Sequence, residues 1–422
     1  MRHLRAGLAA ILSASAAVAA PFTPALAQSA EAPRALQLSR EERSTLTALR
    51  TAAAGPDRAA QDSALATALA AARGADARYA VASLAYQIAR SRGDGRGMGT
   101  AADEMLATNL PQGAERAALL ASQASRAYSA NDVHRADRLL AQMVEAQPNN
   151  PAILADHGQI KARLGDRPAA VALFQRALAA QRALGQPAPE SWYQRALGLA
   201  VDGRLAAQSA TLGRELVVNY PSAVNWRDAL LALRAGDPPR PTGTAPPPPP
   251  ADPALDLDIR RLARAADALA GERDYLEFAQ ALARASLAGE AKAVLDEGVS
   301  RGMLDATEPL VRQQLTAVTA RAAQERAGLT ALRMRAMAGD AAAMIAAGDA
   351  HFGNGQYLPA AELYRAALQR GAADAALVNT RLGAALALGG QRAAAETVLG
   401  QVSGPRAGLA GYWAAWLARR PA

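Results

Sequence analysis

The sequence of 422 residues contains no cysteine, and only 4% of its residues are aromatic. The absence of cysteine excludes disulfide scaffolds, cysteine-ligated zinc, thiolate-held iron–sulfur sites and cysteine nucleophiles. The scarcity of aromatic side chains argues against a β-sandwich or barrel, because strands favour branched and aromatic residues. About a quarter of the residues are instead alanine, which has the highest helix propensity. We therefore expect an all-α protein.

Lysine is nearly absent too: Lys161 and Lys292 stand against 44 arginines, a bias typical of GC-rich bacterial genomes. The formal net charge is +8, from 46 basic and 38 acidic side chains. The chain has no basic cluster with interleaved aromatics of the kind that single-strand binders use, so we expect no nucleic-acid partner. Local basic faces such as Arg260, Arg261 and Arg264 are expected to be solvated, with contact to anionic envelope polymers as the alternative.

Residues 1–27 have the three parts of a secretory signal peptide. Arg2 and Arg5 form a positive start, residues 6–20 form an uncharged apolar run, and Ala25 to Ala27 is a small-x-small cleavage site. The alternative is a membrane anchor, but the run is shorter than the ~20 residues that a span requires. We expect cleavage after Ala27, a periplasmic or secreted protein, and no transmembrane anchor after signal removal.

A proline-rich stretch, residues 237–253, interrupts the composition. Five consecutive prolines, Pro246 to Pro250, favour a stiff polyproline II spacer. A docking ligand for a proline-reading domain is the alternative. The predicted organisation is thus an N-terminal block (28–236), a linker (237–253) and a C-terminal block (254–422).

Both blocks contain internal periods. In the first, an offset of 34 superimposes Leu120 on Leu154, Ala124 on Gly158, Ala136 on Ala170 and Leu140 on Phe174. In the second, an offset of 35 superimposes Met344 on Asn379, Gly348 on Gly383, Ala360 on Ala395 and Tyr364 on Leu399. Periods of this length are typical of stacked helix-turn-helix repeats.

These units resemble tetratricopeptide repeats (TPRs), over about residues 117–220 and 341–402. Small residues such as Gly158 and Gly348 stand where the two helices of a repeat cross, and large ones fill the gaps between them. Segments 76–110 and 274–302 are interpreted as degenerate repeats, the latter broken at Gly289, with chance alanine periodicity as the alternative. The predicted fold is an all-α solenoid of TPR-like repeats in two blocks joined by the proline-rich linker.

The C-terminal segment carries an apolar stripe at helical spacing: Leu409, Tyr412, Trp413, Trp416 and Leu417. We interpret it as a helix that caps the last repeat. A membrane-surface or partner-docking helix is the alternative, because tryptophans and the following arginines suit an interface.

Candidate catalytic and metal motifs are weak. The G-x-S-x-G motif around Ser300 needs a preceding strand, and a helical segment precedes it here. The glycine-rich stretch 93–99 lacks a phosphate-binding spacing, and His134, His157 and His351 have no paired ligands at i, i+4, so we expect structural roles for them. The sequence predicts no enzyme, no cofactor and no metal.

The TPR resemblance implies binding of protein segments on the surface of the first helices of the repeats. Its groove positions correspond here to Ser125, Tyr128, Gln159, Arg163, Tyr193, Asp349 and Phe352. A receptor for chaperone C-terminal carboxylates is not expected, because the lysines and asparagines of that subtype are replaced by Ala121, Ser125, Ala155, Gln159 and Leu197.

The predicted function is a non-catalytic scaffold of the bacterial cell envelope, whose partners are envelope proteins or peptide segments. The alternative is a carbohydrate- or lipid-binding solenoid in envelope polysaccharide assembly or export, and an enzyme is the third hypothesis. The sequence leaves the oligomeric state open.

Overall fold

The computed structural model describes residues 35–235 and 252–420, so the predicted signal peptide and nearly all of the predicted linker lie outside the described residues. Within the described ranges the chain is helical and has no strand. The helices are α2 (Arg40–Ala54), α3 (Arg58–Ala71), α4 (Ala75–Ser91), α5 (Gly95–Ala107), α6 (Gly113–Ser129), α7 (Val133–Ala146), α8 (Pro151–Arg163), α9 (Arg167–Ala183), α10 (Glu190–Asp202), α11 (Ala206–Asn219), α12 (Ala223–Ala235), α13 (Pro253–Ala265), α14 (Gly271–Arg284), α15 (Ala288–Ser300), α16 (Pro309–Ala338), α17 (Ala341–Gly353), α18 (Tyr357–Gln369), α19 (Ala375–Leu388), α20 (Arg392–Leu399), the 3₁₀ helix η1 (Gly404–Arg406) and α21 (Ala407–Ala418). Among these helices, none is both long and apolar enough to cross a membrane.

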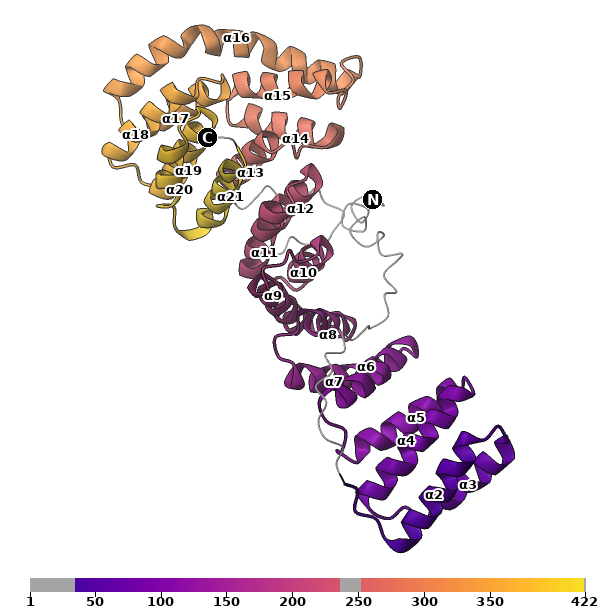
Figure 1. The fold of residues 1–422 in the computed structure, drawn as a ribbon. Helices are drawn as coiled ribbons and strands as arrows, with labels where there is room; N and C mark the ends of the chain where they lie inside the picture. The colour runs from indigo at the N-terminus through magenta and orange to yellow at the C-terminus, as the bar shows by residue number, and fades with distance from the viewer. Residues whose placement is uncertain (1–34, 236–251, 421–422) are drawn as a thin grey trace. The chain divides into compact units, whose positions relative to one another are not determined.

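The chain forms two compact units, Met1–Ala188 and Pro189–Ala422. The first unit contains α2–α9 and the second contains α10–α21 (Figure 1). The sequence-based division grouped α10–α12 with the N-terminal helices, whereas in the structure they belong to the second unit. The reason is packing: α12 lies against α13, and α11 lies against α21.

The first unit stacks four helical hairpins in chain order: α2/α3, α4/α5, α6/α7 and α8/α9. The connecting turns of the last three hairpins have the same form. A residue with positive φ (Gly93, Asn131 or Gly165) is followed by an aspartate that caps the second helix (Asp94, Asp132 or Asp166). A side-chain oxygen on the capping residue satisfies a backbone N–H that the helix itself leaves unpaired. The shared turn confirms that residues 76–110 form a helix-turn-helix unit.

Close crossing of the paired helices depends on the predicted small residues. A Cβ on Gly158 would lie 3.1 Å from ring carbons of Phe174, and a Cβ on Gly348 would lie 2.6 Å from a ring carbon of Tyr364. The same relation, sixteen residues apart, joins Gly383 to Leu399. The hairpins α8/α9, α17/α18 and α19/α20 are therefore TPR-like, as the repeat pattern predicts.

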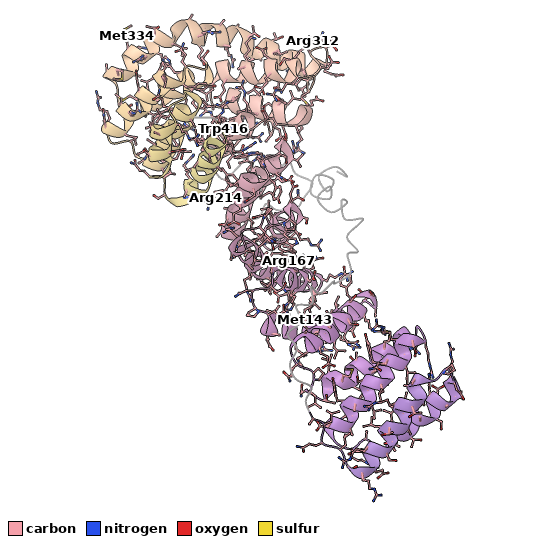
Figure 2. All side chains as sticks on the ribbon, in the orientation of Figure 1. Met143, Arg167, Arg214, Arg312, Met334 and Trp416 are labelled. Atoms are coloured by element: carbon pink, nitrogen blue, oxygen red, sulfur yellow. The ribbon has the colours of Figure 1, made fainter. Side chains whose placement is uncertain are left out.

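The second unit departs from the repeat pattern at α14 to α16. The predicted break at Gly289 is wrong: the turn lies at residues 285–287, and Gly289 is inside the first turn of α15. The 30-residue helix α16 runs along α15 and on over α17 (Figure 1). Arg312 and Met334 mark its two ends in Figure 2. Its buried side chains form one stripe: Val311, Val318, Ala322, Leu329 and Ala336.

The C-terminal helix α21 covers the last repeat and also reaches further. Its predicted apolar stripe is buried, and it packs against α19 and α20. It also contacts α11, and the ring centroid of Tyr412 lies 6.1 Å from that of Trp226 on α12. The indole Nε1 of Trp416 donates to the carbonyl of Ala265 at 2.9 Å. Helix α21 thus holds α11 to α13 and the C-terminal repeats together, and its tryptophans are not on the surface.

Candidate partner-binding surfaces

Four of the predicted groove residues lie on the first helices of consecutive hairpins in the first unit. Ser125 and Tyr128 lie on α6, and Gln159 and Arg163 lie on α8. Tyr128 is 41% exposed, Arg163 is exposed, and the other two are half-buried. The guanidinium carbon of Arg163 lies 4.4 Å from the ring centroid of Tyr128. The structure therefore brings two of the predicted residues into direct cation–π contact.

A further contact joins the first helices of the preceding hairpins. The hydroxyl of Tyr79 on α4 donates to Oε1 of Glu115 on α6 at 2.6 Å. Burial, together with the hydrogen bond and the negative charge of Glu115, raises the pKa of Tyr79, so the phenol stays protonated. Helices α4, α6 and α8 are thus connected side chain to side chain along one side of the hairpins.

Asp156 belongs to the same surface, and the sequence analysis missed it. It lies three residues before Gln159 and seven before Arg163, so all three share one face of α8. Burial raises the pKa of Asp156 to about 6. Within the described parts of the chain its carboxylate has no hydrogen bond or ion pair. We call Ser125, Tyr128, Asp156, Gln159 and Arg163 the α6–α8 face.

The neighbouring His157 has a structural role, as predicted. Its Nε2 lies 2.9 Å from Oδ1 of Asp137 on α7, and Lys161 donates to the same carboxylate at 2.8 Å. Burial lowers the pKa of His157, which keeps the ring neutral at pH 7. Asp137 thus joins α7 to α8. No group of three metal-ligating side chains gathers in the described ranges.

Tyr193, Asp349 and Phe352 are correctly placed on helices but are not surface residues. Their exposed fractions are 3%, 9% and 5%. The ring of Tyr193 on α10 lies 6.1 Å from that of Tyr220, and Phe352 on α17 lies beneath the guanidinium of Arg261, at 4.6 Å. The expectation of an open groove at Asp349 and Phe352 is therefore wrong, because α13 covers this side of the second unit.

The charges of α13 meet those of four other elements in the interior. We call this set the ionic core: Asp258 and Arg261 on α13, Glu290 on α15, Asp349 on α17, Arg381 on α19 and Arg406 on η1. All six are at most 9% exposed. Three carboxylates balance three guanidinium groups, so the set has no net charge.

Each buried charge of the ionic core has a partner of opposite sign. Arg261 donates from Nη2 to Glu290 at 2.7 Å, and Arg381 donates from Nη1 to Asp349 at 2.6 Å. The hydroxyl of Tyr364 also donates to Asp349, at 2.7 Å. Burial alone would lower the pKa of Arg261, but the charges of Glu290, Asp349 and Asp258 raise it well above its usual value. The arginines therefore stay charged, and no acid is left over for a ligand.

The sequence interpretation of Arg260 and Arg261 as solvated surface charges is wrong. Arg260 is 9% exposed and Arg261 is 4% exposed. Arg260 donates to Asp256 at 2.8 Å, and Asp256 also accepts from Arg234 on α12 at 2.7 Å. The local sequence does not indicate that these arginines are buried, since alternating charges along a helix are typical of a solvent-exposed helix.

The serine motif does not form a nucleophile elbow. Ser300 is the last residue of α15, and its hydroxyl donates to the carbonyl of Glu297 at 2.9 Å. Gly302 follows with a φ of 68°, in the left-handed conformation that ends helices. A helix and not a strand precedes the serine, as the sequence predicts.

The sequence matches no protein-family model and no curated protein. Solved structures similar to this chain include the following two. One is a tetratricopeptide repeat protein from Parabacteroides merdae ATCC 43184, with 10% identity, 82% of this chain and 100% of that chain covered, and a TM-score of 0.27. The other is the structure of Naa15/Naa10 bound to HypK-THB, with 12% identity, 86% of this chain and 65% of that chain covered, and a TM-score of 0.27. At these scores neither structure carries an argument, and the TPR-like architecture is assigned from the helix pairs themselves.

Proposed function

We propose that this protein is a non-catalytic, exported scaffold that binds a segment of a cell-envelope protein on its α6–α8 face. The observation that carries the proposal is a pair of opposite, unneutralised charges on one helix. Arg163 has an aromatic partner and no carboxylate partner within the described residues, and Asp156 has no cationic partner there.

The spacing of these charges suits a peptide. Seven residues along a helix correspond to about 10.5 Å. The half-buried Gln159 and Ser125 and the exposed ring of Tyr128 lie on the same face, and they offer amide, hydroxyl and aromatic contacts. A protein segment with an acidic and a basic side chain about 10 Å apart matches this pattern, since complementary charges give a binding surface its specificity.

The envelope location is supported by the sequence alone. Residues 1–27 have the positive start, apolar run and small-residue cleavage site of a secretory signal. Sequencing the N-terminus of the protein recovered from cells tests this part. A mature chain that begins at Gln28 supports it, and an intact Met1 in the soluble cytosolic fraction contradicts it.

Binding is tested by in-cell crosslinking of the tagged full-length protein, followed by quantitative mass spectrometry. We expect Arg163→Glu and Asp156→Asn each to reduce recovery of the same envelope protein. The matched control is Arg138→Glu, which makes the same charge change at an exposed position of α7, the second helix of its hairpin. Equal recovery with Arg163→Glu and Arg138→Glu would contradict the proposed surface. Reversal of Asp349 is not a suitable test, because that residue is buried in the ionic core.

A further inference from the structure

Helix α13 is buried along its middle on every side. The seven consecutive residues from Asp256 to Leu262 are all at most 9% exposed. Four of these seven side chains are charged: Asp256, Asp258, Arg260 and Arg261. A helix that is buried all round is ordinarily apolar all round, so α13 has the position of a core helix and the composition of a surface helix.

The partners of α13 come from the helices around it. Asp258 accepts from Arg381 on α19 at 3.0 Å and from Arg406 on η1 at 2.8 Å. Arg261 reaches Glu290 on α15 and lies 3.5 Å from Asp349 on α17. In Figure 1, α13 lies between α14 and α21. The helix is thus surrounded by α12, α14, α15, α17, α19 and the C-terminal segment.

The surface that α13 covers includes positions at which the repeat pattern predicts partner binding. Asp349 and Phe352 stand at groove positions of the α17/α18 repeat, and both contact α13 through Arg261. We call the surface made by Glu290, Asp349, Phe352, Arg381 and Arg406 the inner groove. In the structure its occupant is a helix of the same chain.

When the inner groove is considered without α13, two of its four charged side chains stay paired and two lose their partners. Arg381 and Asp349 pair directly with each other. Glu290 loses Arg261, and Arg406 loses Asp258 together with Asp252, its other carboxylate partner. The surface that remains therefore offers one free carboxylate and one free guanidinium, which complement a basic and an acidic side chain on an incoming helix.

The charged contacts of α13 also suit a helix that a partner helix can replace. Apolar residues of similar volume would hold a permanent core helix at least as well, because burying ion pairs costs desolvation. In some proteins buried charge pairs instead fix register and partner choice, and polar contacts are typical of interfaces that open.

We propose that α13 is a ligand held in cis in the inner groove, and that the groove takes, in its place, a partner helix carrying an acidic residue followed three residues later by an arginine. This surface is separate from the α6–α8 face. The spacing copies that of Asp258 and Arg261, which are the two side chains that Arg406 and Glu290 recognise.

Hydrogen exchange of the full wild-type chain tests whether α13 leaves the groove. We expect the amides of residues 257–262 to exchange through a partial opening, about tenfold or more faster than those of α17 and α19. Exchange of α13 at the same rate as α17 and α19 would mean that it opens only with the whole unit, and this result overturns the proposal.

Binding in trans tests what the groove recognises. The probe is a fluorescein-labelled peptide of residues 252–265, and the matched control is the same peptide with Asp258→Arg and Arg261→Asp, which keeps the composition and reverses the two charges. The receptor is the full chain with Asp258→Asn, a change in the occupant that leaves the inner groove intact. We expect the peptide to bind this variant about tenfold or more tighter than the wild-type chain, and the control to bind neither.

Two outcomes of the peptide experiment count against the proposal: no binding by a folded variant, or equal binding of the two peptides. Tryptophan fluorescence reports whether the variant is folded, because all four tryptophans lie in the second unit. If the Asp258→Asn variant is unfolded, hydrogen exchange of the wild-type chain is measured in the presence of excess peptide instead. Faster exchange of α13 with the peptide than with the control supports the proposal, and identical exchange overturns it.

Discussion

Nη1 of Arg406 donates a hydrogen bond to Oδ2 of Asp258 at 2.8 Å, across 148 residues of sequence. Both side chains are 3% exposed. Asp258 also accepts from Arg381 and Arg261, so one carboxylate holds three guanidinium groups from α13, α19 and η1. The stability of the second unit therefore depends on this carboxylate far more than on any surface pair.

Asp258→Ala is expected to lower the free energy of unfolding of the second unit by about 3–5 kcal/mol, because it leaves buried arginines without their counter-charge. Urea unfolding followed by tryptophan fluorescence measures this, since the first unit has no tryptophan. The control is Asp296→Ala, which removes an exposed partner of Lys292 within α15 and is expected to cost less than about 1 kcal/mol. Similar effects of the two substitutions would contradict a structural role for the ionic core.

Gly348→Ala tests the close crossing of α17 and α18. The new Cβ would lie 2.6 Å from a ring carbon of Tyr364, which is fully buried and has no room to move away. We expect a loss of about 1–3 kcal/mol in the free energy of unfolding, as for other overpacked cores. Tryptophan-detected urea unfolding again provides the measurement.

The control for that substitution is Gly328→Ala in α16. No atom lies within 4 Å of the Cβ it would add, and glycine inside a helix is less favourable than alanine. This variant is expected to gain about 0.5–1 kcal/mol. If Gly328→Ala lowered the free energy of unfolding as much as Gly348→Ala does, the close crossing of α17 and α18 would not be the reason that position 348 requires glycine.

The repeat pattern predicted the hairpins because it records contacts within one unit of about 34 residues. Gly158 with Phe174, and Gly348 with Tyr364, are such pairs, and the structure confirms them. Local periodicity gave no indication of α16. Its buried side chains form a single stripe of small and branched residues, and they are few for a helix of 30 residues. A 30-residue helix was therefore not predicted.

The covering of the inner groove could not be predicted from the sequence, for a different reason. Asp349 lies on the first helix of its repeat, as its repeat position predicts, but Arg261, which covers it, lies 88 residues away in sequence. Asp156 was missed because it falls between the groove positions of its repeat. Only the fold shows that its carboxylate is desolvated and has no partner among residues 35–235 and 252–420.

Trp416→Phe and Trp413→Phe separate hydrogen bonding from packing in α21. Both side chains are buried, but only Trp416 has an acceptor for its Nε1, the carbonyl of Ala265. Nε1 of Trp413 has no hydrogen-bond partner within the described residues. The Trp416 substitution is therefore expected to cost about 1 kcal/mol more than the Trp413 substitution, because only it removes a hydrogen bond. Urea unfolding followed by circular dichroism measures both, and equal costs would mean that the bond adds nothing to packing.

The pKa of Asp156 predicts how the stability of the first unit varies with pH. Burial raises this pKa from its usual 3.8 to about 6, so the folded state binds the proton more tightly than the unfolded state. The protonated carboxyl is favourable for folding at pH 4 and below. That advantage is lost as the pH rises through about 6, and above pH 7 the ionised carboxylate destabilises the folded unit by up to about 3 kcal/mol.

Asp156→Asn removes the titrating group, so it is expected to stabilise the first unit by up to about 3 kcal/mol at pH 7.5 and to have little effect at pH 4. The measurement is thermal unfolding by circular dichroism, taking the transition that tryptophan fluorescence does not report. Asp132→Asn is the control, since it replaces an exposed helix cap for which asparagine is an equally good residue. A gain at position 156 that is the same at both pH values would contradict a desolvated carboxylate. A gain confined to neutral pH, together with reduced crosslinking, would show that this charge is kept for binding at the expense of stability.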